Sequence, residues 1–151
     1  MERPEINWEH TESFTAGTVG PQGRRVFFLQ ASFGNQVLSL KVEKQQMAGL
    51  ADFLASMLND LPPTDEPELL NSNVGEAKFI EPEEPDWVIG SLGVTYEQSE
   101  DQLILIAEEL IRDEVAEPAQ ARLSLSRLQV EHFIQTAEEL LSSGRPPCPS
   151  C

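Results

Sequence analysis

The two cysteines of the chain, Cys148 and Cys151, lie in its last residues, GRPPCPSC. Thiolates at this spacing are typical of half a zinc site, because the turn between them lets both sulfurs face one tetrahedral ion. A redox dithiol has the same spacing but normally opens a helix, and Pro146 and Pro147 stop the preceding helix from continuing. Three interpretations therefore stay open at this point: a zinc half-site, a thiol pair, and a tail without a metal.

A complete zinc site needs two further ligands, and His10 and His132 are the chain's only histidines. His132 falls opposite the apolar stripe of a predicted helix and is expected to be exposed, and no spacing connects either histidine to the tail. Motifs of metalloproteases and serine hydrolases do not occur. Pairs of acids such as Glu108 and Glu109 are too common in this chain to indicate acid and base catalysis. The sequence therefore favours binding over catalysis.

Lys44 and Arg127 occupy matching positions in the first turn of two predicted helices. A cation there opposes the helix dipole, so its occurrence twice hints at an anion or an acidic neighbour. With so many carboxylates in the chain, a salt bridge is the simpler explanation. We keep Lys44 and Arg127 as candidate contacts for an anion or a partner.

Gln46 and Gln129 also occupy matching positions, near the starts of the same helices. Ser126 stands three residues before Gln129, which predicts a capping box that satisfies free backbone donors. The same explanation suits Gln46 less well, because Glu43 stands at its cap position.

Glycines that could cradle a phosphate recur in each half, but their spacing fits neither the dinucleotide-binding fingerprint nor the phosphate-binding loop. They are predicted instead to relieve a bulge or a close strand crossing. The four residues are Gly17, Gly20, Gly90 and Gly93.

An internal repeat sets the elements that must position these residues. FTAGTVG at 14–20 resembles WVIGSLG at 87–93, and the amphipathic stretch 40–58 resembles 123–141. Alternating apolar runs joined by short turns predict antiparallel strands before each helix. We therefore expect an α+β fold in which a tandem βββα repeat forms a mainly antiparallel sheet of about six strands, with two helices on one face.

The segment between the halves is rich in proline and acids, which is typical of a linker. We predict one duplicated domain over 1–143, with half-repeats 1–61 and 87–143, a linker over 62–86 and a Cys-x-x-Cys tail over 144–151. Within the linker, VGEAKFI is the part expected to be ordered.

The charge balance limits the partners. The chain has 26 acidic and 10 basic residues, a formal net charge of -16, which repels nucleic acids and anionic membrane surfaces unless a local basic patch overrules the total. No stretch is apolar enough for a membrane span or a signal sequence, so a cytoplasmic location is expected.

FTAGTVG, RRVFFLQA, LKVEKQQ, GSLGVTYE and above all GRPPCPSC resemble an uncharacterised bacterial family, small cytoplasmic proteins with a domain of unknown function. The resemblance implies a zinc-ribbon-like C-terminus in which Cys148 and Cys151 supply half the ligands. Family members typically continue with a glycine, a histidine and a further cysteine, whereas this sequence ends at Cys151. The resemblance implies no reaction.

These observations lead to a non-catalytic binding or adaptor module with a truncated metal-binding tail and a protein partner. The first alternative is an enzyme, or enzyme subunit, for a small cationic or metal-bound substrate. The second is a structural homodimer, with zinc shared between the cysteine pairs of two chains.

Overall fold

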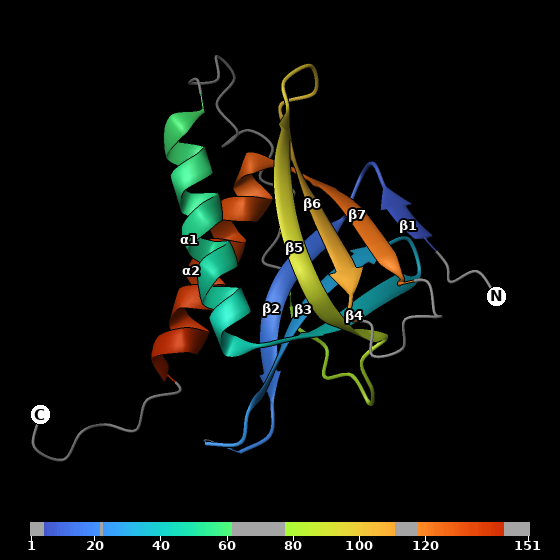
Figure 1. Cartoon of the computed structure of the whole chain (residues 1–151), viewed down its shortest axis with the longest axis vertical. Helices are drawn as coiled ribbons and strands as arrows, with labels where there is room; N and C mark the ends of the chain where they lie inside the picture. Colours follow the sequence, from blue (N-terminus) through green and yellow to red (C-terminus); the bar gives the residue numbers. More distant parts are fainter. Residues whose placement is uncertain (1–4, 22, 62–77, 111–117, 144–151) are drawn as a thin grey trace, which may run out of the picture.

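The computed structural model describes residues 5–21, 23–61, 78–110 and 118–143. Six strands and two helices lie where the sequence pattern predicts them, and together they make an α+β fold (Figure 1). Their bounds in chain order are β2 (Ser13–Val19), β3 (Val26–Phe33), β4 (Gln36–Val42), α1 (Lys44–Asp60), β5 (Trp87–Glu97), β6 (Gln102–Glu109), β7 (Gln120–Leu125) and α2 (Arg127–Ser143). This order suits a tandem βββα repeat, but element order alone does not test duplication, which stays a prediction.

A seventh strand, β1 (Glu5–Trp8), corrects the expected number of six. Its four residues are too few to show a period, so the sequence alone gave no signal for it. It pairs with β7 in parallel, with Ile6 opposite Ala121. The N-terminal segment is therefore part of the sheet.

The sheet is mixed, with the strand order β1-β7-β6-β5-β4-β3-β2. Consecutive strands from β2 to β4 and from β5 to β7 pair antiparallel, as expected, although the β6–β7 connection is long, over residues 110–119. The halves meet where β1 pairs with β7 and where β4 and β5 pair in parallel, over Leu40 with Trp87 and Lys41 with Val88. Parallel neighbours need a long connection, and α1 with the segment up to Asp86 supplies one. These two parallel pairs, β1 with β7 and β4 with β5, make the sheet mixed and not exclusively antiparallel.

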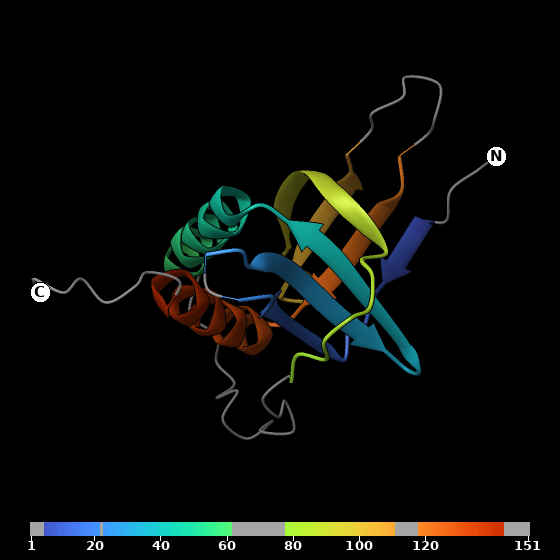
Figure 2. The ribbon, with the colours of Figure 1, turned by 90° about the horizontal axis from the view of Figure 1, so that it is seen from below.

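The sheet curls strongly, as its two edge strands show. β1 and β2 lie at opposite ends of the strand order, yet only residues 9–12 separate them in the chain. Such a connection spans at most about 18 Å, whereas six strand spacings across a flat sheet cover about 29 Å. Curling brings the edges together, and the ring of Trp8 stacks on that of Phe33 with centroids 5.8 Å apart. Figure 2 shows the curl from below.

The two helices lie side by side and antiparallel on one side of the sheet, and a single apolar core fills the space between (Figures 1 and 2). Met47 and Leu54 of α1 and Phe133 of α2 are fully buried there, and Phe133 contacts the ring of Phe14 on β2. No helix within the described ranges has the length and apolarity to cross a lipid bilayer.

Part of the predicted linker packs on the opposite face of β3. The amide of Gln30 donates to the carbonyl of Ile80 at 2.7 Å and accepts its N–H at 2.8 Å. A Cβ on Gly17 would lie 2.1 Å from the ring of Phe79, so only glycine leaves room for that ring. The last two residues of VGEAKFI, Phe79 and Ile80, therefore pack against the sheet.

Candidate functional site

The start of α2 carries a satisfied ion pair. Arg127 donates to the carboxylate of Asp101 through Nε at 3.0 Å and Nη2 at 2.8 Å, and the Tyr96 hydroxyl donates to the same carboxylate at 2.6 Å. Asp101 lies in the β5–β6 hairpin with φ of 52°, a left-handed conformation that aspartate tolerates better than most residues. The hairpin therefore delivers a carboxylate to the helix start, and Arg127 forms the salt bridge that the sequence favoured.

This hydrogen-bonding arrangement shifts three pKa values. Partial burial by itself would raise the pKa of Asp101, but the hydrogen bonds from Arg127 and Tyr96 hold it below its ordinary value. Its hydrogen bond with Asp101 raises the pKa of Arg127, and the same carboxylate raises the pKa of Tyr96. All three shifts favour the charge states that hold the cluster together.

The start of α1 has a different environment, because it lies beside residues of the β2–β3 connection and of β4. Arg25, from the β2–β3 connection, and Lys41, from β4, line the same pocket as Lys44 at the first position of α1. The pocket has a volume of about 360 Å³. We call it the basic pocket; its lining residues are Gly23, Arg25, Val26, Phe27, Lys41, Val42, Glu43 and Lys44.

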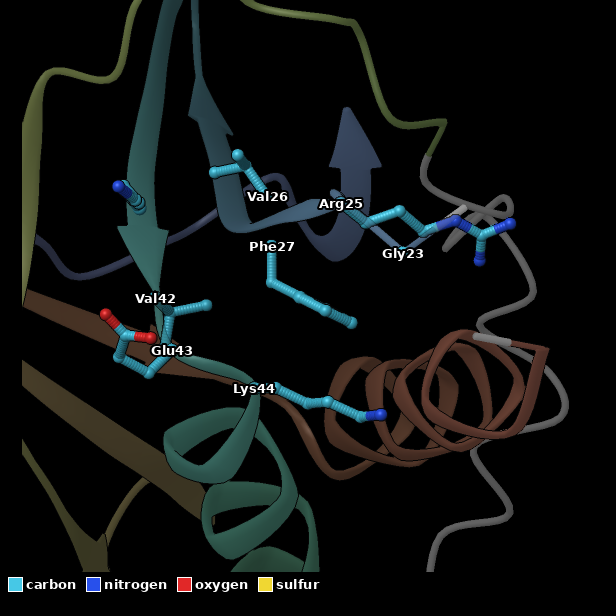
Figure 3. Close-up of a pocket in the computed structure, with 8 residues that line it drawn as sticks. Gly23, Arg25, Val26, Phe27, Val42, Glu43 and Lys44 are labelled. Atoms are coloured by element: carbon cyan, nitrogen blue, oxygen red, sulfur yellow. The ribbon is translucent and has the colours of Figure 1, made fainter. Parts of the chain in front are cut away.

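Figure 3 shows how the basic pocket is arranged. The side chains of Arg25 and Lys44 extend toward the same side, on either side of the Phe27 ring, while the carboxylate of Glu43 points the other way. Lys44 thus lines a pocket to which Arg25 and Glu43 also contribute, whereas Arg127 has an acid directly beside it.

The two matching glutamines both have structural roles. The Oε1 atoms of Gln46 and Gln129 each accept a backbone N–H at 2.9 Å, from Glu43 and Ser126. Gln46 therefore caps its helix as Gln129 does, although its sequence signal was weaker. Each Nε2 then reaches beyond its helix: Gln129 donates to the carbonyl of Thr11 at 2.8 Å, and Gln46 to that of Gly90 at 3.3 Å.

Gly90 is located where β5 bends. The register of β5 against β6 shifts between Ile89 and Ser91, and a Cβ on Gly90 would lie 2.8 Å from the Cα of Leu110. The predicted role of glycine at a bulge and close crossing is confirmed here. The bend carries the rest of β5 past the end of β4 and alongside α1 (Figures 1 and 2).

Beyond the bend, one edge of β5 has no partner strand among the described residues. It pairs with β6 as far as Glu97, but with β4 only at Trp87 and Val88. A pocket of about 530 Å³ separates this edge from α1, and all its lining residues are uncharged. We call it the groove; its lining residues are Gln46, Gly49, Leu50, Phe53, Gly90, Ser91, Leu92, Gly93 and Val94.

The candidate metal ligands are not brought together in the part of the chain that the structure describes. Cys148 and Cys151 lie outside the described residues, so zinc binding by them stays a prediction. His10 is exposed, whereas His132 is half-buried, contrary to expectation, and its Nδ1 atom is buried without a hydrogen-bond partner among described residues. No cluster of three or more metal-ligating side chains occurs in the described ranges.

Sequence reasoning found Lys44 but missed Arg25, Lys41 and the groove. A usable signal for the basic pocket did exist: the chain has 26 acids, yet none lies between residues 13 and 42. Arg24 and Arg25 lie within that gap, whereas Lys41 and Lys44 flank Glu43. The groove had no comparable signal, because it depends on where β5 leaves β4.

Comparison with known proteins gives a family without a described activity. No curated protein and no solved structure matches the chain. A family described as a protein of unknown function (DUF3090) matches residues 6–151, a range that takes in the basic pocket, the groove and the tail cysteines. The zinc-ribbon-like C-terminus stays a prediction under this match. Because the match covers nearly the entire sequence, the chain belongs to the DUF3090 family of proteins of unknown function.

Proposed function

We propose that this protein is a non-catalytic binding module that holds an extended segment of a protein partner in the groove between α1 and β5. The observation that carries the proposal is the edge of β5 from Gly90 to Val94, which lines the groove and pairs with no described strand on that side. An open edge offers N–H and C=O groups to an added strand. The Gly90 carbonyl is an exception, because it already accepts the amide of Gln46.

Glycines on both walls suit a groove that receives a peptide backbone. A Cβ on Gly49 of α1 or on Gly93 of β5 would have no atom within 4 Å, so neither wall is filled by neighbouring side chains. Absence of side chains lets another backbone approach closely. Phe53 is 50% exposed at the same groove, and Leu92 and Val94 are half-buried on β5. Alternate side chains of an extended segment would pack on these apolar residues.

Charge favours a segment with basic flanks. The groove itself is uncharged, but Asp52 and Glu97 are exposed on the elements that form it, within a chain of net charge -16. Such a field attracts cationic partners and speeds their association. The partner class is therefore an extended segment with apolar residues in its centre and lysine or arginine at its ends.

Selection from a random linear peptide library displayed on phage, with the full chain as bait, tests this proposal. Enriched peptides should alternate apolar residues between basic flanks. Their affinity, measured by fluorescence polarisation, should fall at least about tenfold in Gly49→Leu, because the new side chain fills the groove. The same substitution removes a glycine from a helix interior and should stabilise the fold by about 0.5–1 kcal/mol.

Ala55→Leu is the matched control, because Ala55 is exposed on α1 and does not line the groove. It should bind the selected peptides as the unmodified chain does. Failure to enrich any peptide, or equal binding by the Gly49→Leu chain, would reject the groove as the binding site.

A further inference from the structure

We propose that the groove holds an aromatic side chain of the partner segment, inserted between α1 and β5 beside the ring of Phe53. This inference rests on the peptide groove proposed above and adds which side chain the groove selects. Two interfaces in the molecule carry it. Each helix lies along one strand, α2 along β2 and α1 along β5, but a groove separates the second helix–strand pair (Figures 1 and 2).

Aromatic rings close the interface between α2 and β2. Phe133 of α2 is fully buried, Phe14 of β2 is 3% exposed, and their ring centroids lie 4.6 Å apart. Tilted rings at such a distance attract each other beyond the contribution of the area that they bury. The α2 helix therefore packs directly on its strand.

The matching positions of α1 carry smaller side chains. In the resemblance between the two helices, Leu50 matches Phe133 and Gly49 matches His132. A leucine thus stands in place of the buried ring, and a glycine stands in place of an imidazole that is half-buried. Both Leu50 and Gly49 line the groove. The interface between α1 and β5 therefore lacks aromatic volume where the groove opens.

Phe53 supplies a ring at the wall of the groove. It lines the groove and is 50% exposed. Gly49 precedes it by four residues and so lies on the same face of α1, where a Cβ would have no atom within 4 Å. The glycine thus leaves the space next to the Phe53 ring open. The groove volume of about 530 Å³ lies within the usual range for a bound organic group.

An aromatic side chain suits this space better than an aliphatic one. It buries a larger apolar area and packs edge-to-face or offset against another ring. A strand added at the edge of β5 directs alternate side chains to one face, so one of them can reach α1. The partner segment is therefore expected to carry phenylalanine, tyrosine or tryptophan at one central position.

Three synthetic peptides of the form Lys-Lys-Val-Thr-X-Thr-Val-Lys-Lys, in which X is phenylalanine, leucine or alanine, test the inference with the full chain. Their basic ends and alternating apolar residues follow the partner class proposed for the groove. Affinity measured by fluorescence polarisation should be at least about tenfold higher with phenylalanine than with alanine, and about threefold higher than with leucine.

Phe53→Leu should abolish the preference for phenylalanine over leucine, because the ring that the peptide contacts is gone. The substitution is at an exposed position, so the variant should fold as the original chain does. Phe33→Leu is the matched control, since Phe33 is also an exposed phenylalanine, 40% exposed, but does not line the groove. This control should keep the preference.

Equal affinity for the phenylalanine and leucine peptides would overturn the inference, as would an equal loss of preference in Phe53→Leu and Phe33→Leu. Failure of all three peptides to bind would overturn it as well. The groove itself is judged separately by the random library and by Gly49→Leu, so an aromatic anchor can be rejected while the groove stands.

Discussion

The two junctions between a hairpin and a helix start share a plan but differ in charge. At the start of α2, the β5–β6 hairpin presents Asp101 to Arg127, with 2.8 Å between the closest atoms. At the start of α1, the β2–β3 hairpin presents Arg25 beside Lys44. A cation in the first turn is thus neutralised by an aspartate in one half, whereas in the other half it lines a pocket.

That difference gives residues at matching positions different surroundings. Arg127 is 12% exposed in its side chain and has its charge satisfied by the fold. Lys44 is exposed and borders a pocket large enough for a ligand. Matching sequence positions therefore do not imply matching environments, because the neighbouring hairpin differs in the residues that it brings to each helix start.

Replacing the acid at the start of α2 by a cation should have the largest effect on stability. Asp101→Lys places a cation against Arg127 and removes the acceptor of the Tyr96 hydroxyl. The free energy of unfolding should fall by about 2–3 kcal/mol, since the Arg127 charge loses its partner in a mostly buried position. Urea denaturation followed by the fluorescence of the buried Trp8 and Trp87 measures this change.

Glu100→Lys is the control for that experiment. Glu100 is exposed and adjacent in the hairpin, so the same charge change there should alter stability by no more than about 0.5 kcal/mol. Equal losses in both variants would mean that overall charge, and not the ion pair, sets the stability of this junction.

The capping glutamines provide a second comparison of the two helix starts. Gln129 is 7% exposed and Gln46 is half-buried, and the bond from Gln129 to Thr11 is the shorter one. Substitution by alanine should therefore cost about 2 kcal/mol at Gln129 and about 1 kcal/mol at Gln46. Urea denaturation of both variants measures the difference, and a larger loss at Gln46 would contradict this ranking.

The smallest predicted effect is a pH dependence of stability at the start of α2. Because the folded state lowers the pKa of Asp101, the stabilisation is present above the unfolded pKa, near 3.9, and is lost as pH falls through the folded value. Asp101→Asn should thus be less stable by about 1 kcal/mol at neutral pH, and this gap should close in acid. Asparagine tolerates the left-handed backbone there.

Unfolding of both proteins from neutral pH down to acid tests the sign of that effect. A gap between the original chain and Asp101→Asn that stays constant, or widens as pH falls, would show that the Asp101 carboxylate does not stabilise the junction through its charge.

Local patterns were sufficient to predict most of the secondary structure. The alternation in QVLSLKV, the turn at Gly34 and Asn35, and the S-x-x-Q cap at Ser126 each depend on neighbours in the chain, so they specify β4, its hairpin and the start of α2. β1 escaped prediction because its place is set by a partner more than a hundred residues away, with Glu5 opposite Gln120.

The sequence by itself determined the α+β class, the positions of two helices and six strands, and the presence of a cation at each helix start. Only the tertiary structure decided that the sheet is mixed and curled, that β5 leaves β4 beyond Val88, and which hairpin meets which helix. The reason is physical: periodicity and caps act within a few residues, whereas Asp101 meets Arg127 only after the whole sheet has brought a distant hairpin to the helix start.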